Sequence, residues 1–230
     1  MVLFSRWTKH YLGLVRWKNA TGMRDFTYIQ EHVTKSLHGK NTGPWSLGFK
    51  VYRDVNHGTG GRSNPSSSLS SAMHHQQSSQ GKDNKLMYQV TLGQQPGQVY
   101  CMVDGSVVVE AEKELEIILS RLKNLWQMRQ SVMIEGTSFE IGDFTLRVAN
   151  ILLGSTYKGL LLEISYHPCS APNVAADLFR EFVESVVHPT AQLSCEYEYN
   201  YENVGLSNQD FTSAHTGYQY MMLFRNDGLL

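Results

Sequence analysis

Two alternating glutamates near the C-terminus have the spacing that best fits chemistry. Glu196 and Glu198 are separated by one tyrosine, so on an extended strand both carboxylates would lie on the same face. Carboxylate pairs inside a barrel can hold a divalent metal ion. The segment that follows, Tyr199-Asn200, supplies no cation to complete a phosphate-binding set.

Triphosphate-tunnel hydrolases resemble this pattern, with the motif E-x-E-x-K on a barrel strand. Here Asn200 stands where the lysine would be, and no second acidic strand is evident. Glu110 and Glu112 also alternate, but a helix is expected to begin there, and acidic residues suit the positive end of a helix dipole. A metal-dependent, tunnel-type phosphohydrolase is kept as the alternative function, and no catalytic, metal-binding or cofactor-binding residue is assigned.

The remaining polar groups indicate structural roles. Cys101, Cys169 and Cys195 are too far apart for a C-x-x-C or metal-ligand spacing, which favours reduced thiols inside a cell. The glycines at 58, 60 and 61 lack the preceding strand and following helix of a phosphate-binding loop. His74 and His75 have no second ligand pair nearby, so the simpler interpretation is that they are polar residues without a metal-binding role.

Composition and charge argue against several function classes. The chain has 230 residues, with 20 lysines and arginines against 21 acids and a net charge of −1. It lacks the positive field with which nucleic-acid-binding proteins collect phosphates, so direct nucleic-acid binding is not expected. No apolar run reaches the ~18–20 residues that span a bilayer, so no membrane span is expected.

Short alternating segments predict about eight β-strands. Gly-containing turns such as Asp104-Gly105 and Gly142-Asp143 join neighbouring segments. The expected strands are 11–18, 45–53, 85–92, 99–103, 106–109, 131–141, 144–153 and 159–167. Strands this short and numerous remove their exposed edges best by closing into an antiparallel barrel or a strongly curled sheet.

Helices are expected between groups of strands. They span 24–38, 111–126, 173–187 and about 210–225. The second would turn an apolar face inward, with Trp126 at its end where the apolar stripe runs out. That face comprises Leu115, Ile118, Leu119, Leu122 and Leu125. We therefore expect a mainly β, α+β fold, an antiparallel eight-stranded β-barrel flanked by helices.

One domain, 11–230, accounts for these elements. The segment 54–84 is rich in Ser, Gly and Gln and has little to bury, so a disordered insert is expected there. Residues 1–10 form an N-terminal extension. The basic, acid-free start also occurs in mitochondrial transit peptides, although a strand at 11–17 fits the sequence better.

Five segments carry a family resemblance. They are G-P-W-S-L-G-F-K-V-Y-R (43–53), K-L-M-Y (85–88), L-W-Q-M-R-Q (125–130), F-T-L-R-V-A-N-I-L-L-G-S-T-Y-K-G-L-L-L-E-I (144–164) and Y-Q-Y-M-M-L (218–223). Together they resemble the Mediator complex subunit 20 family in its fungal form. The segments follow the family's order and span most of the chain apart from 1–10 and 54–84.

The resemblance implies both a fold and a role. The family fold is an eight-stranded antiparallel barrel flanked by helices, without enzymatic activity. The implied role is that of a nuclear subunit in the head module of the Mediator transcriptional coactivator. The implied partners are Mediator subunit 18, as a heterodimer, and through it the C-terminal segment of subunit 8. The subunit would also help bridge regulators to the TATA-binding protein and RNA polymerase II.

Five residues are candidates for the partner interface. Aromatic and arginine side chains are over-represented among interface hot spots, which favours Trp126 and Arg129. In the terminal helix, Tyr218, Met221 and Met222 would make an adaptable apolar surface for a helix-in-groove contact. Two alternatives stay open, namely that Trp126 is a core residue and that the terminal helix covers one end of its own barrel.

Overall fold

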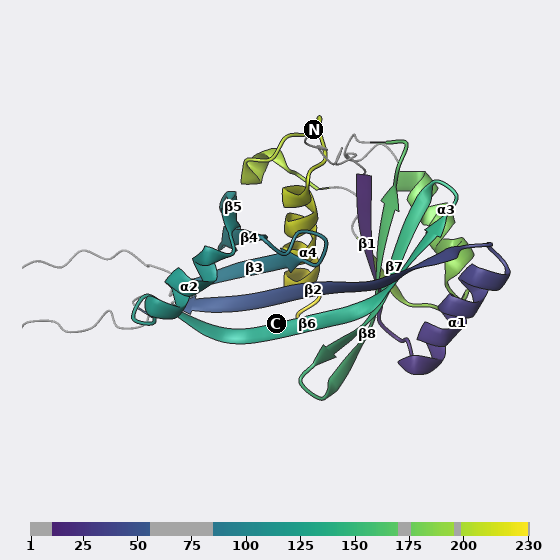
Figure 1. The fold of residues 1–230 in the computed structure, drawn as a ribbon, viewed down its shortest axis with the longest axis horizontal. Coiled ribbons are helices and arrows are strands. Elements are labelled where there is room, and N and C mark those ends of the chain that lie inside the picture. The colour runs from purple at the N-terminus through teal and green to yellow at the C-terminus, as the bar shows by residue number, and fades with distance from the viewer. Residues whose placement is uncertain (1–10, 56–84, 170–175, 196–198, 230) are drawn as a thin grey trace, which may run out of the picture.

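The computed structural model describes residues 11–55, 85–169, 176–195 and 199–229, whose strands form one nine-stranded sheet (Figure 1). All recorded strand pairs are antiparallel. The strands are β1 (Tyr11–Trp17), β2 (Lys40–Asp54), β3 (Leu86–Leu92), β4 (Gln98–Val103), β5 (Val108–Glu112), β6 (Trp126–Ile141), β7 (Phe144–Leu153), β8 (Thr156–Tyr166) and β9 (Leu193–Cys195). Their order in the sheet is β5-β4-β3-β2-β6-β7-β8-β1-β9. The prediction of a mainly β, antiparallel fold is confirmed.

Four α-helices accompany the sheet. They are α1 (Met23–Lys35), α2 (Glu114–Arg121), α3 (Ala176–Val186) and α4 (Ser213–Asn226), with a short 3-10 helix, η2 (Glu202–Val204), before α4. The helix expected at 24–38 corresponds to α1, in which Ile29 and Val33 are fully buried. No helix in the described ranges is both long and apolar enough to cross a membrane.

The expected closure into an eight-stranded barrel is wrong for the described residues. The sheet is open, and its two outermost strands, β5 and β9, do not pair with each other in the described ranges. The helix α4 lies between the two halves of the curled sheet and contacts β1, β3, β4 and β5 (Figure 1). It fills space that side chains would fill in a small closed barrel, so the two halves stay apart.

The helix α4 is consequently a core element. Tyr220, Met221 and Phe224 have no exposed surface, and Phe224 stacks on Phe49 of β2 with ring centroids 4.6 Å apart. A helix buried on nearly every side belongs to the interior of a domain. The sequence favoured an adaptable surface for a partner contact at this helix, whereas in the structure α4 packs into the chain's own core.

The region 108–135 also differs from the expected long helix 111–126. Residues 108–112 form β5, α2 has only eight residues, and β6 begins already at Trp126. Ile118 is 51% exposed and Leu125 40% exposed, while Leu119 is buried. The apolar residues have helical spacing, but Leu122 leaves the helical conformation (φ −89°, ψ 40°) and ends the helix.

Candidate protein-binding site

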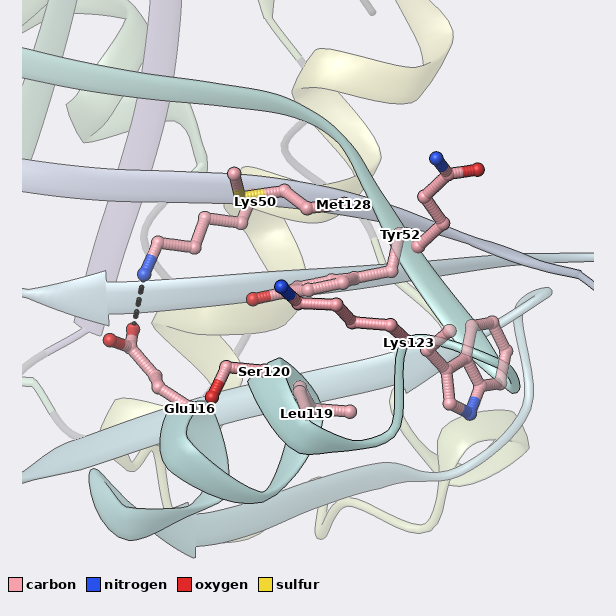
Figure 2. Close-up of a pocket in the computed structure, with 9 residues that line it drawn as sticks. Lys50, Tyr52, Glu116, Leu119, Ser120, Lys123 and Met128 are labelled. Atoms are coloured by element: carbon pink, nitrogen blue, oxygen red, sulfur yellow. Dashed lines mark hydrogen bonds and ion pairs between the residues drawn. The ribbon is translucent and has the colours of Figure 1, made fainter.

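A groove of about 450 Å³ lies between α2 and the β2–β6 pair (Figure 2). Phe49 of β2 packs on α4, so Lys50, the next residue, points to the opposite face of the sheet. The groove therefore lies on the face that α4 does not cover. Its lining comprises Lys50, Tyr52, Glu116, Leu119, Ser120, Lys123, Trp126, Gln127 and Met128.

A polar contact fixes one wall of the groove. The Lys50 ammonium and the Glu116 carboxylate form an ion pair of 2.7 Å, drawn in Figure 2. The amide of Gln89, in β3, donates to the same Glu116 oxygen at 2.7 Å. Because both side chains of the ion pair are about one quarter exposed, the contact is shielded from solvent more than a fully exposed pair would be. It ties α2 to two strands.

A small apolar cluster forms the floor. Tyr52, Met87 and Leu119 are buried together, and the half-buried Trp126 packs against them. Burial raises the pKa of the Tyr52 phenol to about 12, with a further contribution from the nearby Glu116 charge. The phenol is therefore neutral near physiological pH, and it contributes an apolar ring to the groove rather than a titrating group.

Arg129 occupies a β-bulge next to Met128, which lines the groove. Val51 pairs with Gln130 and Tyr52 with Met128, so Arg129 is the extra residue of β6 at this point. Bulges re-aim a side chain and increase the local twist. A second, shallower hollow of about 240 Å³ is lined by Arg53, Gln127, Met128 and Arg129, and shares two residues with the first.

The two hollows have a positive charge balance. Their linings contain four cationic side chains, Lys50, Lys123, Arg53 and Arg129, against the single acid Glu116. The whole chain has a net charge of −1, so this concentration is local. Glu116 pairs with Lys50, which leaves three cations in excess. An apolar floor with a cationic rim is suited to bind a protein segment that combines apolar and acidic residues.

The structure brings together two of the five interface candidates. Trp126 lines the groove, and Arg129 lines the neighbouring hollow. Tyr218 and Met221 are buried in the main core, and Met222 is half-buried beside them. As partner contacts all five stay a prediction, and the geometry favours Trp126 and Arg129.

Several groove residues were not found from the sequence. Lys50 and Tyr52 come from β2, which is distant in sequence from β6, and only strand pairing places them beside Trp126. Strand alternation could not place Met128 either, because steps of two from the buried Val132 and Ile134 put position 128 on the core face, and only the bulge at Arg129 turns it to the exposed one.

The one fully enclosed carboxylate in the described core has a structural function. Glu163 of β8 accepts a hydrogen bond of 2.5 Å from Tyr220 of α4 and pairs with Arg147 of β7. Burial raises the pKa of Tyr220 well above 10, and the Glu163 charge raises it further. The contact therefore holds α4 against the sheet, with the phenol as a permanent donor.

Metal chemistry has no candidate site in the part of the chain that is described. No group of three or more His, Cys, Asp or Glu residues there could hold an ion. Glu196 and Glu198 lie outside the described residues, as do His74, His75 and the glycines at 58, 60 and 61. Burial raises the pKa of the Cys101 thiol to about 12, so this thiol is not a nucleophile near neutral pH.

Comparison with known proteins identifies the family. A curated relative, Mediator of RNA polymerase II transcription subunit 20b of Arabidopsis thaliana, is 25% identical over 224 residues and covers 93% of both chains. Subunit 20 of Schizosaccharomyces pombe is 39% identical over 87 residues, covering 38% of this chain and 44% of its own. A chain in the structure of the S. pombe Mediator head module has a TM-score of 0.35 and 13% identity, covering 81% of this chain and 98% of its own.

The match to a family model decides the assignment and confirms the resemblance seen in the sequence. The model, described as the TATA-binding related factor (TRF) of subunit 20 of the Mediator complex, matches residues 19–225. This range extends from the turn after β1 almost to the end of α4 and includes the groove. The chain therefore belongs to the Mediator subunit 20 family and is a transcription coactivator subunit of that complex.

Proposed function

We propose that the chain is a non-enzymatic, nuclear subunit of the Mediator head module that forms a heterodimer with subunit 18. Through subunit 18 it would contact the C-terminal segment of subunit 8. In this position it would help bridge regulators to the TATA-binding protein and RNA polymerase II. The observation that carries the proposal is the family match over residues 19–225.

The exposed apolar surface supports a role in assembly. Ile117, Ile118, Leu122, Leu125 and Met128 lie within twelve consecutive positions and are each at least 36% exposed. Met128 lines the groove, and the other four lie in α2, which forms one of its walls, or in the turn that follows it. Exposed apolar residues that cluster within a rim of charged residues are typical of protein-binding sites.

The heterodimer is tested by thermal melting of the purified chain with and without purified subunit 18. We expect the melting midpoint to rise, because a ligand that binds only the folded state stabilises it by ~2.7 kcal/mol at a hundredfold excess over Kd. An unchanged midpoint at saturating subunit 18 would contradict the proposal. Size-exclusion chromatography at the same concentrations measures the stoichiometry of the complex.

The wider contacts require separate experiments. A peptide with the subunit 8 C-terminal sequence should be retained by the heterodimer and not by this chain alone. Retention by the chain alone would contradict the indirect route. Purified TATA-binding protein and RNA polymerase II should each be added to the immobilised heterodimer. Binding of either supports a bridging subunit, whereas binding of neither supports a subunit that only completes the head module.

A further inference from the structure

The strand β6 has an open edge over more than half its length. On one side β2 pairs with it from Glu140 to Trp126, with one extra residue in β2 at position 42 and one in β6 at Arg129. On the other side β7 pairs only with its last part, Gly136–Ile141. Among the described residues, positions 126–135 of β6 therefore have a strand neighbour on one side only, and their outward N–H and C=O groups face no other strand.

The fold itself leaves this edge open. At Gly136 a side chain is excluded, since a Cβ atom there would lie 2.0 Å from the carbonyl oxygen of Val148 in β7. One residue beyond their last pair, the β7–β8 pairing shifts register, because Asn150 pairs with Leu160 but Leu152 pairs with Tyr157, which leaves one extra residue in β8. Beyond Ala149, β7 therefore pairs with β8 alone among the described strands.

The middle of the open edge lacks the features that protect edge strands in free proteins. Natural edges are blunted by charged residues, β-bulges, proline or very short length. Between Arg129 and Glu135, β6 has five uncharged residues, Gln-Ser-Val-Met-Ile, and no proline. Val132 and Ile134 are buried against the core, while Met133 is 65% exposed. The edge is therefore long, uncharged in its middle and partly apolar.

We propose that an extended segment of the heterodimer partner adds to this edge as a further strand, next to residues 127–135 of β6; this rests on the proposed function. Main-chain hydrogen bonds along β6 would supply affinity, and side chains at alternate positions would supply specificity. The exposed Met128 and Met133 would contact apolar residues of the added strand.

The charged residues near β6 indicate which side chains the added strand needs at one of its ends. Arg53, Lys123 and Arg129 lie beside the end of β6 that starts at Trp126, and Glu135 lies at the other end of the open edge. The fitting segment is therefore apolar in its middle and acidic where it meets the three cations. It needs no acid near Glu135, where like charges would repel.

Hydrogen–deuterium exchange of the chain alone and of its purified heterodimer with subunit 18 tests the strand. We expect alternate amides within 127–135 to exchange at least roughly tenfold more slowly in the heterodimer. The amides of α4, already buried in the free chain, act as the internal reference. A stable heterodimer without added protection in 127–135 overturns the inference and leaves the proposed function intact.

Failure to form any heterodimer overturns both the proposed function and this inference. Protection of the same amides in the chain alone at rising concentration, with a doubled mass, would place a second copy on the edge. That result overturns the assignment to the heterodimer partner.

A matched pair of double variants tests the same edge by affinity. Ser131→Lys/Met133→Lys places charges on exposed positions of β6, and Met23→Lys/Leu152→Lys does the same at exposed positions of α1 and β7. We expect the first to weaken heterodimer affinity at least about tenfold and the second to leave it unchanged. Equal effects, or a silent first variant, overturn the inference.

Discussion

Arg16 in β1 and Asp227 at the end of α4 form an ion pair of 2.9 Å, although 211 positions separate them in the sequence. The Asp227 side chain is 6% exposed, and it also accepts hydrogen bonds or ion-pair contacts from Ser194 and Lys18. A carboxylate at a helix C-terminus is unfavourable for the helix dipole. The three donors compensate for this, and they tie the last turn of α4 to β1 and β9.

Acid should weaken this connection. Burial tends to raise the pKa of Asp227, but the hydrogen bonds from Arg16, Ser194 and Lys18 outweigh burial and lower it below its usual 3.8. Because the folded-state pKa lies below the unfolded one, the carboxylate stabilises the fold fully above pH 3.8, and this contribution is lost as the pH falls below that value.

The variant Asp227→Asn should therefore be less stable than the native chain at neutral pH, by about 1–3 kcal/mol, because Arg16 loses a charged partner. The difference should shrink in acid. Urea unfolding over a pH series measures both quantities. A difference that stays constant across the series would show that the ion pair is not the cause.

Two adjacent residues of α2 should differ strongly in their contribution to stability. Leu119 is 5% exposed in the small cluster with Tyr52 and Met87, whereas Ile118 is 51% exposed. We expect Leu119→Ala to cost about 2–3 kcal/mol and Ile118→Ala about 0.5 kcal/mol or less. Chemical denaturation compares the two, and equal losses would mean that the orientation of α2 is wrong.

The segment 56–83 should be dispensable for folding. Its two flanks are already joined, because the Asp54 N–H donates to the Lys85 carbonyl at 2.9 Å and Arg53 pairs with Leu86. A short Gly/Ser turn can therefore replace it, and the shorter loop lowers the entropic cost of closure by about 1–2 kcal/mol. Melting and binding to subunit 18 should both survive the deletion. Loss of either would make the segment part of the fold or of the interface.

The sequence allowed local strands to be predicted well, because each depends on its own alternation. The strands expected at 85–92 and 144–153 correspond closely to β3 and β7. Barrel closure could not be predicted in this way. It depends on whether β5 and β9 meet, and the helix α4, which contacts β5 at one end of the sheet and β1 near the other, lies between the two halves.

The candidate site could be predicted in part. Trp126 and Arg129 were identified by residue type, but the expected helix 111–126 assigned Trp126 to the wrong element. Helical spacing of Leu115, Leu119 and Leu122 indicated a buried face, yet Leu122 is 36% exposed. Periodicity identifies an apolar face without indicating whether the chain's own core or another protein covers it.

Removal of the terminal helix should unfold the domain. Truncation after Ser207 deletes α4, whose Tyr220 and Phe224 have no exposed surface, and it leaves Glu163 without one of its two partners. We expect a broad thermal transition and aggregation. Phe224→Ala is a milder version and should cost about 3–5 kcal/mol. Cooperative melting of the truncated chain would instead indicate that α4 docks as a separate unit.

The cationic rim should determine how fast the partner binds. Arg129 lies at the bulge of β6 beside the groove, and Arg24 is an exposed arginine on α1. Charge at the edge of an interface acts mainly on the association rate and its salt dependence. We expect Arg129→Glu to slow association with subunit 18 roughly threefold, or ~0.6 kcal/mol, at low salt. The effect should fade as salt shortens the screening length.

The control variant Arg24→Glu should change neither the association rate nor its salt dependence in surface plasmon resonance. If the two variants behave alike, the binding site is not at this end of β6.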